Sequence, residues 1–197
     1  MTARKHQLHT KTGDIVRLLE REFAKSCEFL YDRACMSGDE PLVAHQLPLF
    51  IGNERTSPEK YCQVDILILR KLPDGRKEIA VIIEIEETGI SQIKILGKFL
   101  ASALCKNYLY DSEEHPVPLS SDVLFVQVIR ERNESKYKRQ KWDDIDSRIR
   151  AILPIKGSGI IDYRLIHGSL NDFEFDGELS AELSKAVADH LKKTRIK

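Results

Sequence analysis

Residues 62–86 read CQVDILILRKLPDGRKEIAVIIEIE, and this stretch decides the fold class. Two apolar runs, CQVDILIL (62–69) and EIAVIIEIE (78–86), lie on either side of the turn signal PDG (73–75). Because proline presets φ and glycine accepts positive φ, the pattern predicts a β-hairpin. Both strands are apolar on both faces apart from a few acidic residues, which is typical of strands in the middle of a covered sheet.

The segment before the hairpin carries apolar residues at helical spacing. A stripe from Val16 to Ala34 predicts a helix over residues 15–34, with Asp14 at its N-cap. Residues 1–13 are polar, lack the apolar core of a signal peptide and predict a flexible N-terminus.

The rest of the chain alternates between helical and strand patterns. Residues 91–106 predict a helix whose apolar side includes Ile93, Leu96, Leu100 and Ala103. Strands are further predicted at 45–51, 122–129 and 160–166, and helices at 142–153 and 179–192. The order α-β-β-β-α-β-α-β-α implies an α/β fold with a mixed central β-sheet and helices on both faces.

Composition predicts one soluble domain over residues 1–197. Lys+Arg and Asp+Glu number 31 each, so the net charge favours no partner by itself. The four cysteines are scattered without a C-x-x-C pair, as is typical of reduced thiols in a cytoplasmic protein. No apolar run reaches the roughly 20 residues of a membrane span, and no glycine-rich phosphate loop is present. A membrane and a nucleotide cofactor are therefore not expected as partners, and the six histidines, without a metal-ligand spacing, receive no role.

Three acidic residues interrupt the apolar strands of the hairpin: Asp65, Glu84 and Glu86. Burying an unpaired charge is costly, so each needs a partner, a metal or an exposed strand end. Glu84 and Glu86 share a face of their strand because side chains alternate with a period of two. Solvent-facing carboxylates with lysine partners are the alternative to a metal site.

The register of the hairpin decides whether Asp65 lies beside Glu84. A two-residue turn at Asp74-Gly75 pairs them, with Cβ atoms about 5 Å apart. A three-residue Pro73-Asp74-Gly75 turn separates them by one position unless a bulge restores the pairing. Carboxylates at that distance repel one another, and a divalent cation such as Mg²⁺ relieves the repulsion.

The pattern Asp65, hairpin, Glu84-Ile85-Glu86 and following helix resembles the PD-(D/E)xK nuclease superfamily, whose core also has the order α-β-β-β-α-β. Glu86 stands where most of that family has lysine. The E-x-E variant resembles the Bam-type restriction endonucleases, as does the stretch EIEETGISQIKILGKFL (84–100). The resemblance implies a restriction endonuclease-like core with C-terminal α-β-α additions.

The resemblance also implies roles for individual residues. Asp65 and Glu84, with the carbonyl of Ile85, would bind Mg²⁺, for which Mn²⁺ is a substitute. Glu86 would position or deprotonate the attacking water. The family often adds an acidic residue from the first helix, and Glu20 is the candidate.

Because Glu86 stands in place of the family's lysine, another residue would have to supply the positive charge of that lysine. Lys94 and Lys98, about one turn apart on the predicted helix 91–106, are candidates for a migrated lysine. A solvent-facing role for both is the alternative.

A basic run follows the strand at 122–129. It reads RERNESKYKRQK, and its cations can neutralise phosphates while an aromatic ring stacks on bases. A solvated loop is the alternative. The candidate DNA-binding residues are Arg130, Arg132, Lys136, Tyr137, Lys138, Arg139 and Lys141.

These patterns together favour a Mg²⁺-dependent DNA endonuclease. The chain has little room for a separate recognition domain, and a cut through both strands of a duplex favours a C2 homodimer. The alternatives are a catalytically inactive DNA-binding or protein-interaction module of the same fold, and a repair nuclease for single-stranded or branched DNA.

Overall fold

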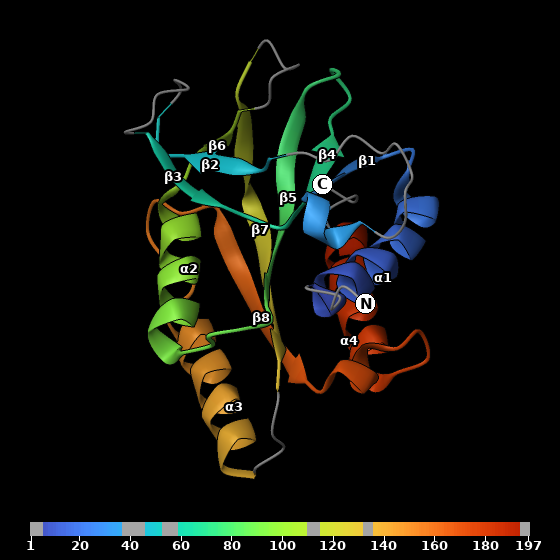
Figure 1. Ribbon diagram of the computed structural model, residues 1–197. Coiled ribbons are helices and arrows are strands. Elements are labelled where there is room, and N and C mark those ends of the chain that lie inside the picture. The colour runs from blue at the N-terminus through green and yellow to red at the C-terminus, as the bar shows by residue number, and fades with distance from the viewer. Residues whose placement is uncertain (1–5, 37–45, 53–58, 110–114, 132–135, 194–197) are drawn as a thin grey trace.

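The computed structural model describes residues 6–36, 46–52, 59–109, 115–131 and 136–193. For residues 136–138 it describes the backbone but not the side chains. Within these residues, four α-helices and eight strands form an α/β fold (Figure 1). The helices are α1 (Gln7–Phe23), α2 (Gln92–Leu104), α3 (Lys136–Ala151) and α4 (Glu178–Lys193), with short 3-10 helices η1 (Arg33–Cys35) and η2 (Leu170–Phe173). The strands are β1 (Cys27–Tyr31), β2 (Pro48–Phe50), β3 (Lys60–Gln63), β4 (Ile66–Lys71), β5 (Lys77–Glu86), β6 (Asn107–Tyr108), β7 (Val117–Arg130) and β8 (Ile160–Gly168).

The central sheet mixes antiparallel and parallel pairs. β1, β4 and β5 are antiparallel neighbours, whereas β5, β7 and β8 run parallel and are connected through helices. The short strands β6, β2 and β3 extend the sheet from the first residues of β7. The mixed sheet with helices on both faces is the predicted fold class.

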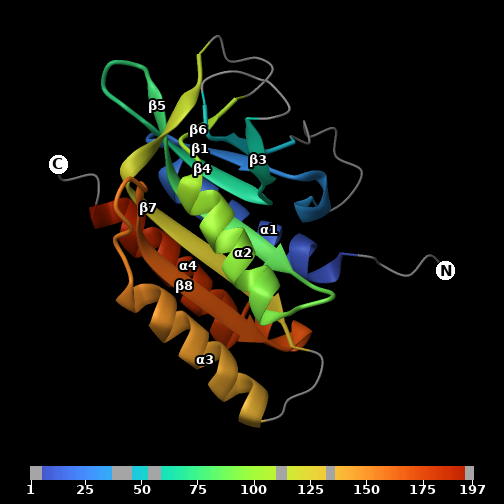
Figure 2. The ribbon, with the colours of Figure 1, turned by 90° about the vertical axis from the view of Figure 1, so that its left-hand side faces the viewer.

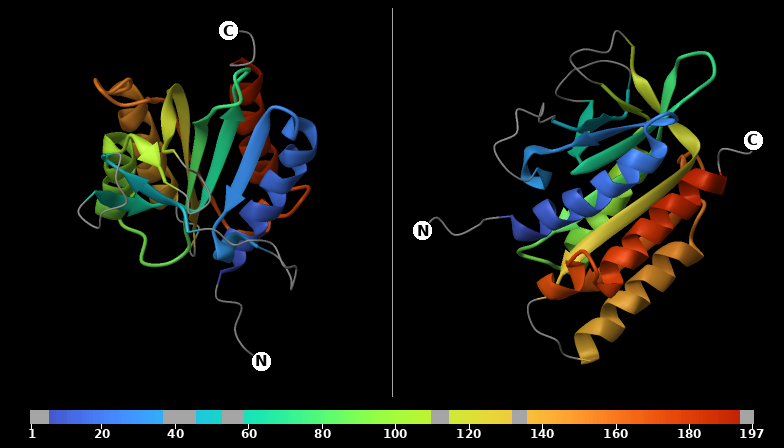
Figure 3. Two further views of the ribbon diagram at one scale, coloured as in Figure 1. Left: turned by 90° about the horizontal axis from the view of Figure 1, so that it is seen from above. Right: turned by 90° about the vertical axis from the view of Figure 1, so that its right-hand side faces the viewer.

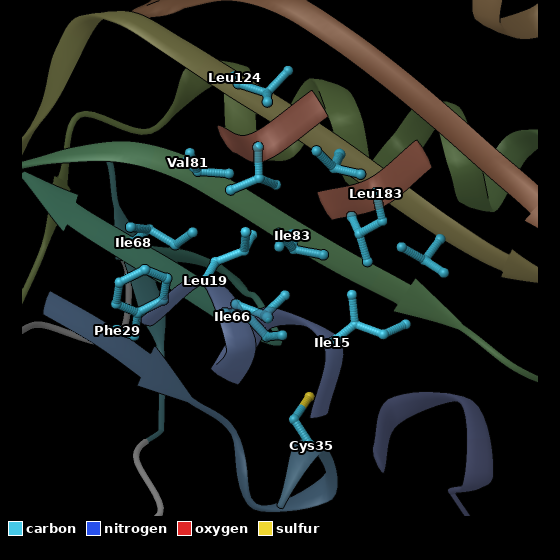
Figure 4. Close-up of a cluster of buried hydrophobic side chains, with 14 of the residues drawn as sticks. Ile15, Leu19, Phe29, Cys35, Ile66, Ile68, Val81, Ile83, Leu124 and Leu183 are labelled. Carbon is cyan, nitrogen blue, oxygen red and sulfur yellow. The ribbon is translucent and has the colours of Figure 1, made fainter. Parts of the chain in front are cut away.

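The helices form two layers. α1 and α4 cover one face of the sheet, and α2 and α3 cover the other, as the view from above shows (Figure 3). Each layer has its own apolar core. In the α1/α4 layer, Leu19 and Leu183 meet Ile68, Val81 and Leu124 of the sheet (Figure 4).

The first helix differs from its prediction at both ends. α1 begins at Gln7, with His6 at the N-cap, so residues 7–13 are helical and the prediction of a flexible N-terminus is wrong for them. Asp14 lies inside the helix and pairs with Arg17 (2.6 Å). The helix ends at Phe23 because β1 pairs with β4 over residues 27–31, a strand that the helical stripe concealed.

The predicted strand 62–69 is two strands. Val64 donates its N–H to Leu47 O, on the β2 side, and Asp32 donates its N–H to Asp65 O, on the β1 side. The chain therefore passes from β3 to β4 at Val64–Asp65, and Asp65 lies in the break and not within a strand.

The hairpin register comes from a three-residue turn and a bulge. Leu72 N–H bonds to Arg76 O (2.8 Å) around Pro73-Asp74-Gly75, and Gly75 has φ of 84°. This turn pairs Lys71 with Lys77, but Ala80 is an extra residue on β5, and beyond it Ile66 pairs with Ile83. The bulge thus restores the register in which position 65 lies beside position 84.

The apolar side of α2 also differs from its prediction. The sheet-facing residues are Ile95, Phe99 and Ala103, and of the predicted residues only Ala103 is buried. Ile93 is 84% exposed, and Leu96 and Leu100 are also exposed. The helix has two apolar stripes, and sequence spacing does not distinguish which one packs on the sheet.

Among the described residues, no helix is long and apolar enough to cross a membrane. None of the four cysteines, all of which lie among the described residues, forms a disulfide.

The packing of α1 on η1 predicts opposite effects for two glycine substitutions. A Cβ at Gly13 would lie 1.9 Å from Cys35 O, whereas a Cβ at Gly97 in α2 would meet nothing within 4 Å. Gly13→Ala is expected to lower the free energy of unfolding by about 2–3 kcal/mol through overpacking. The matched control Gly97→Ala is expected to raise it by about 0.5–1 kcal/mol through helix propensity. Urea denaturation measures both, and a Gly13→Ala protein as stable as wild type would contradict this close approach.

Candidate active site

Asp65 and Glu84 come together where β3 passes into β4. Asp65 Oδ2 accepts the N–H of Ile85 (2.7 Å), which holds the carboxylate against β5. Burial raises the pKa of Asp65 above its usual value, although the neighbouring His9 and the N–H of Ile85 oppose the shift. The predicted proximity of these two carboxylates is present in the fold.

Glu84 is fully buried at the centre of the sheet. Its Oε2 accepts a hydrogen bond from Lys98 Nζ (2.9 Å), while its Oε1 has no hydrogen-bond partner among the described residues. Burial, and next the charge of Asp65, raises the pKa of Glu84 well above its usual range. Two carboxyl groups in this situation retain a proton at a pH where isolated carboxyl groups have lost theirs.

Both candidate lysines of α2 face the acidic residues of β5. Lys98 contacts Glu84 and also Gln63 O (3.4 Å). Burial lowers the pKa of Lys98, but the charge and hydrogen bond of Glu84 and the charges of Asp65 and Glu86 together raise it more, so the net shift is upward and the lysine stays charged. Lys94 forms an ion pair with Glu86, whose side chain is 5% exposed. Each lysine thus pairs with an acidic residue of β5, and the Lys94 side chain is also 41% exposed to solvent. We call Asp65, Glu84 and Glu86, with Lys94 and Lys98, the carboxylate cluster.

Ile85 contributes its main chain to the cluster. Its N–H contacts Asp65, while its side chain is buried in the α1/α4 core. Its carbonyl stays a predicted metal ligand.

The α1 residue that contacts Asp65 is His9, not Glu20. His9 Nε2 lies 3.7 Å from Asp65 Oδ1. Glu20 is eleven residues, or about 16 Å, further along the helix, where it accepts a hydrogen bond from Tyr31 Oη (3.3 Å). Sequence reasoning missed His9 because it placed residues 1–13 outside the helix. The spacing of the two histidines in HQLH (6–9), three residues apart, was the available signal.

The basic run does not form a single loop. Arg132 lies outside the described residues, and α3 begins at Lys136, which also places Tyr137 and Lys138 in its first turn. α3 lies beside α2 on the same face of the sheet (Figure 2).

Three cations of the run have contacts in the fold. Arg130 Nη1 lies 3.0 Å from Glu87 Oε1, next to the carboxylate cluster. Lys141 Nζ lies 5.0 Å from the centre of the Trp142 ring. Arg139 lines a pocket of about 320 Å³ between α3 and α4 that contains no residue of the carboxylate cluster. Arg139 Nε also lies 3.9 Å from Glu131 Oε2, so of these three cations Arg130 is the one whose partner directly follows the carboxylate cluster in sequence.

Comparison of the chain with protein-family models, with curated proteins and with solved structures gives no match.

Proposed function

We propose that this protein is a Mg²⁺-dependent DNA endonuclease with a restriction endonuclease-like core. The observation that carries the proposal is the pairing of Asp65 with a fully buried Glu84 whose Oε1 has no hydrogen-bond partner among the described residues. A buried carboxylate is costly unless a cation or hydrogen bonds compensate it. Hard oxygen donors of this kind fit Mg²⁺, with Mn²⁺ as a substitute.

The residues of the carboxylate cluster would have different roles in the reaction. Asp65, Glu84 and the Ile85 carbonyl would hold the metal. When bound, Mg²⁺ polarises a phosphate oxygen and lowers the pKa of a coordinated water. Glu86 would orient the attacking water and accept its proton, and Lys94 forms an ion pair with the Glu86 carboxylate.

Lys98 would supply the positive charge that the family's motif lysine supplies. It approaches Glu84 from α2, the helix that directly follows the E-x-E strand. A cation at this position would stabilise the negative charge that develops on the scissile phosphate in the transition state. The departure of Glu86 from the family pattern is then compensated by a lysine from the next element.

DNA is the proposed substrate because the basic run begins beside the site and continues away from it along α3. Arg130 ends β7 next to Glu87, and α3 continues the basic run with Arg139 and Lys141. Cations along a surface neutralise phosphates and position the duplex without reading its sequence.

The alternative function is an inactive nuclease-fold module that binds DNA or protein. The observation that favours it is that Lys98 and Lys94 already neutralise Glu84 and Glu86 without a metal. Metal binding at Asp65 and Glu84 distinguishes an enzyme from such a module.

Cleavage of supercoiled plasmid by the purified protein tests the proposal. With Mg²⁺ or Mn²⁺ we expect nicked or linear products, and with EDTA none. Single-stranded and branched DNA, assayed in parallel, distinguish a restriction-type enzyme from a repair nuclease. No cleavage of any substrate, combined with no Mg²⁺ binding, would overturn the enzyme in favour of the module.

A second copy of the chain is the proposed partner, with α2 at the interface. Ile93 (84% exposed), Leu100 (48%) and Leu104 (54%) form an apolar stripe on the helix that carries Lys94 and Lys98. An isologous helix pair would cover this stripe and bring two carboxylate clusters to one duplex.

Sedimentation analysis tests the homodimer. We expect the wild type to sediment as a dimer and Leu100→Glu as a monomer, because a charge on the stripe opposes its burial. The control is Phe175→Glu, which changes a 77% exposed side chain away from α2 and should leave the dimer intact. If Leu100→Glu and Phe175→Glu sediment at the same mass, the proposed α2 interface is contradicted.

A further inference from the structure

Three metal-ligand side chains meet at the start of α1. His6, His9 and Glu87 each offer one ligand atom, and these atoms lie within 4.8 Å of one another. The histidines are three residues apart, so they share a face of the helix, and their ring centroids are 5.2 Å apart. Glu87 directly follows β5 and is not a member of the carboxylate cluster.

The two oxygens of Glu87 have separate environments. Oε1 accepts the N–H of Leu8 (3.1 Å) and a hydrogen bond from Arg130 Nη1 (3.0 Å). Oε2 faces His9 Nδ1 at 3.2 Å. The carboxylate is therefore oriented through one oxygen, and the other is directed towards the histidines.

The separation of these two atoms suits a shared metal. Nitrogen and oxygen ligands of a tetrahedral Zn²⁺, each bound at about 2.0–2.2 Å, lie about 3.4 Å apart. His9 Nδ1 and Glu87 Oε2 are within a few tenths of an ångström of that value. His6 is exposed, so its side chain can move to complete three ligands.

The other nitrogen of His9 faces a carboxylate. His9 Nε2 lies 3.7 Å from Asp65 Oδ1, just beyond hydrogen-bond distance. Metal-bound imidazoles usually turn their second nitrogen to such an acceptor, and a small shift of either side chain on metal binding would close this contact. His9 thus lies between Glu87 and the carboxylate cluster.

We propose that His6, His9 and Glu87 form a second metal site, for a transition metal of the zinc class. Two imidazoles and one carboxylate favour such a metal over Mg²⁺, which prefers oxygen ligands. Three protein ligands leave a fourth position for water or a substrate oxygen. The site does not depend on the nuclease proposal, because its ligands differ from Asp65 and Glu84.

Co²⁺ titration of the EDTA-treated, dialysed full chain tests the site through visible absorption. We expect one equivalent of Co²⁺ to produce a ligand-field band that Zn²⁺ displaces and millimolar Mg²⁺ does not. His6→Ala is expected to weaken Co²⁺ binding at least about tenfold. The matched control, His115→Ala, changes an exposed histidine outside the cluster and should bind like wild type.

Absence of the band in the wild type, or equal losses in His6→Ala and His115→Ala, would overturn the site. Far-ultraviolet circular dichroism verifies that each variant is folded. Glu84→Gln should retain the Co²⁺ band even where it abolishes DNA cleavage. A wild type that cuts DNA without binding Co²⁺ refutes only the second site, and one that binds Co²⁺ without cutting DNA refutes only the nuclease.

Discussion

Glu84→Gln is expected to reduce Mg²⁺-dependent plasmid cleavage by about 10³-fold or more, because it removes the charge of a metal ligand from a buried site. The amide retains the shape of the carboxylate, so the fold survives. Initial rates of nicking at saturating Mg²⁺ measure the effect. The control is Glu22→Gln, which removes an exposed carboxylate from α1 and should cut at the wild-type rate. Cleavage by Glu84→Gln within tenfold of wild type would exclude Glu84 as a metal ligand.

The same substitution has a predicted effect on stability without metal. Burial and Asp65 raise the pKa of Glu84 in the folded chain, so the fold binds a proton there that the unfolded chain releases. The stability from that proton is fully present below the ordinary carboxyl pKa and is lost as the pH rises through the folded value.

We therefore expect the free energy of unfolding of the metal-free wild type to fall between pH 5 and pH 8, and that of Glu84→Gln to fall less. Urea denaturation in EDTA at both pH values measures this difference. Mg²⁺ should stabilise the wild type at pH 8 and leave Glu84→Gln unchanged, since a ligand stabilises only the state that binds it. A pH dependence that is the same in both proteins would contradict the raised pKa.

Lys98→Met is expected to lower the free energy of unfolding by about 2 kcal/mol at pH 8 in EDTA, because it leaves the Glu84 carboxylate buried without its cation. The Lys98 side chain is 32% exposed, so the loss should be smaller than for a fully buried pair. Lys94→Met should cost less than about 1 kcal/mol, because the Lys94 side chain is 41% exposed.

The double variant Lys98→Met/Glu84→Gln supplies the control for Lys98. With the buried charge removed as well, most of the lost stability should return, and the double-mutant cycle gives the coupling between the two residues. Urea denaturation of the four proteins measures that coupling. Purely additive losses would show that Lys98 stabilises the chain through contacts other than Glu84.

The parts of this protein that the sequence determined are those that depend on local patterns. The hairpin of β4 and β5, the helix after it and the acidic positions Asp65, Glu84 and Glu86 follow from apolar runs, turn residues and charges within apolar segments. Such signals are local because strand alternation and turn geometry depend on neighbours in the chain. The mixed α/β class follows from the order of these elements.

Only the tertiary structure decided how these elements meet. The turn at 73–75 alone would separate Asp65 from Glu84, and the bulge at Ala80 brings them together. The break at Asp65 exists because Val64 bonds to Leu47, on the β2 side, while β4 pairs with β1.

Long-range packing likewise determined which side chains surround the carboxylates. α2 turns Ile95 and Phe99 to the sheet, which brings Lys94 and Lys98 over β5. α1 begins early enough to bring His9 to Asp65. The two apolar stripes of α2 differ little in local helix propensity, and so do the two possible starts of α1. Burial against strands far away in the sequence is what separates them.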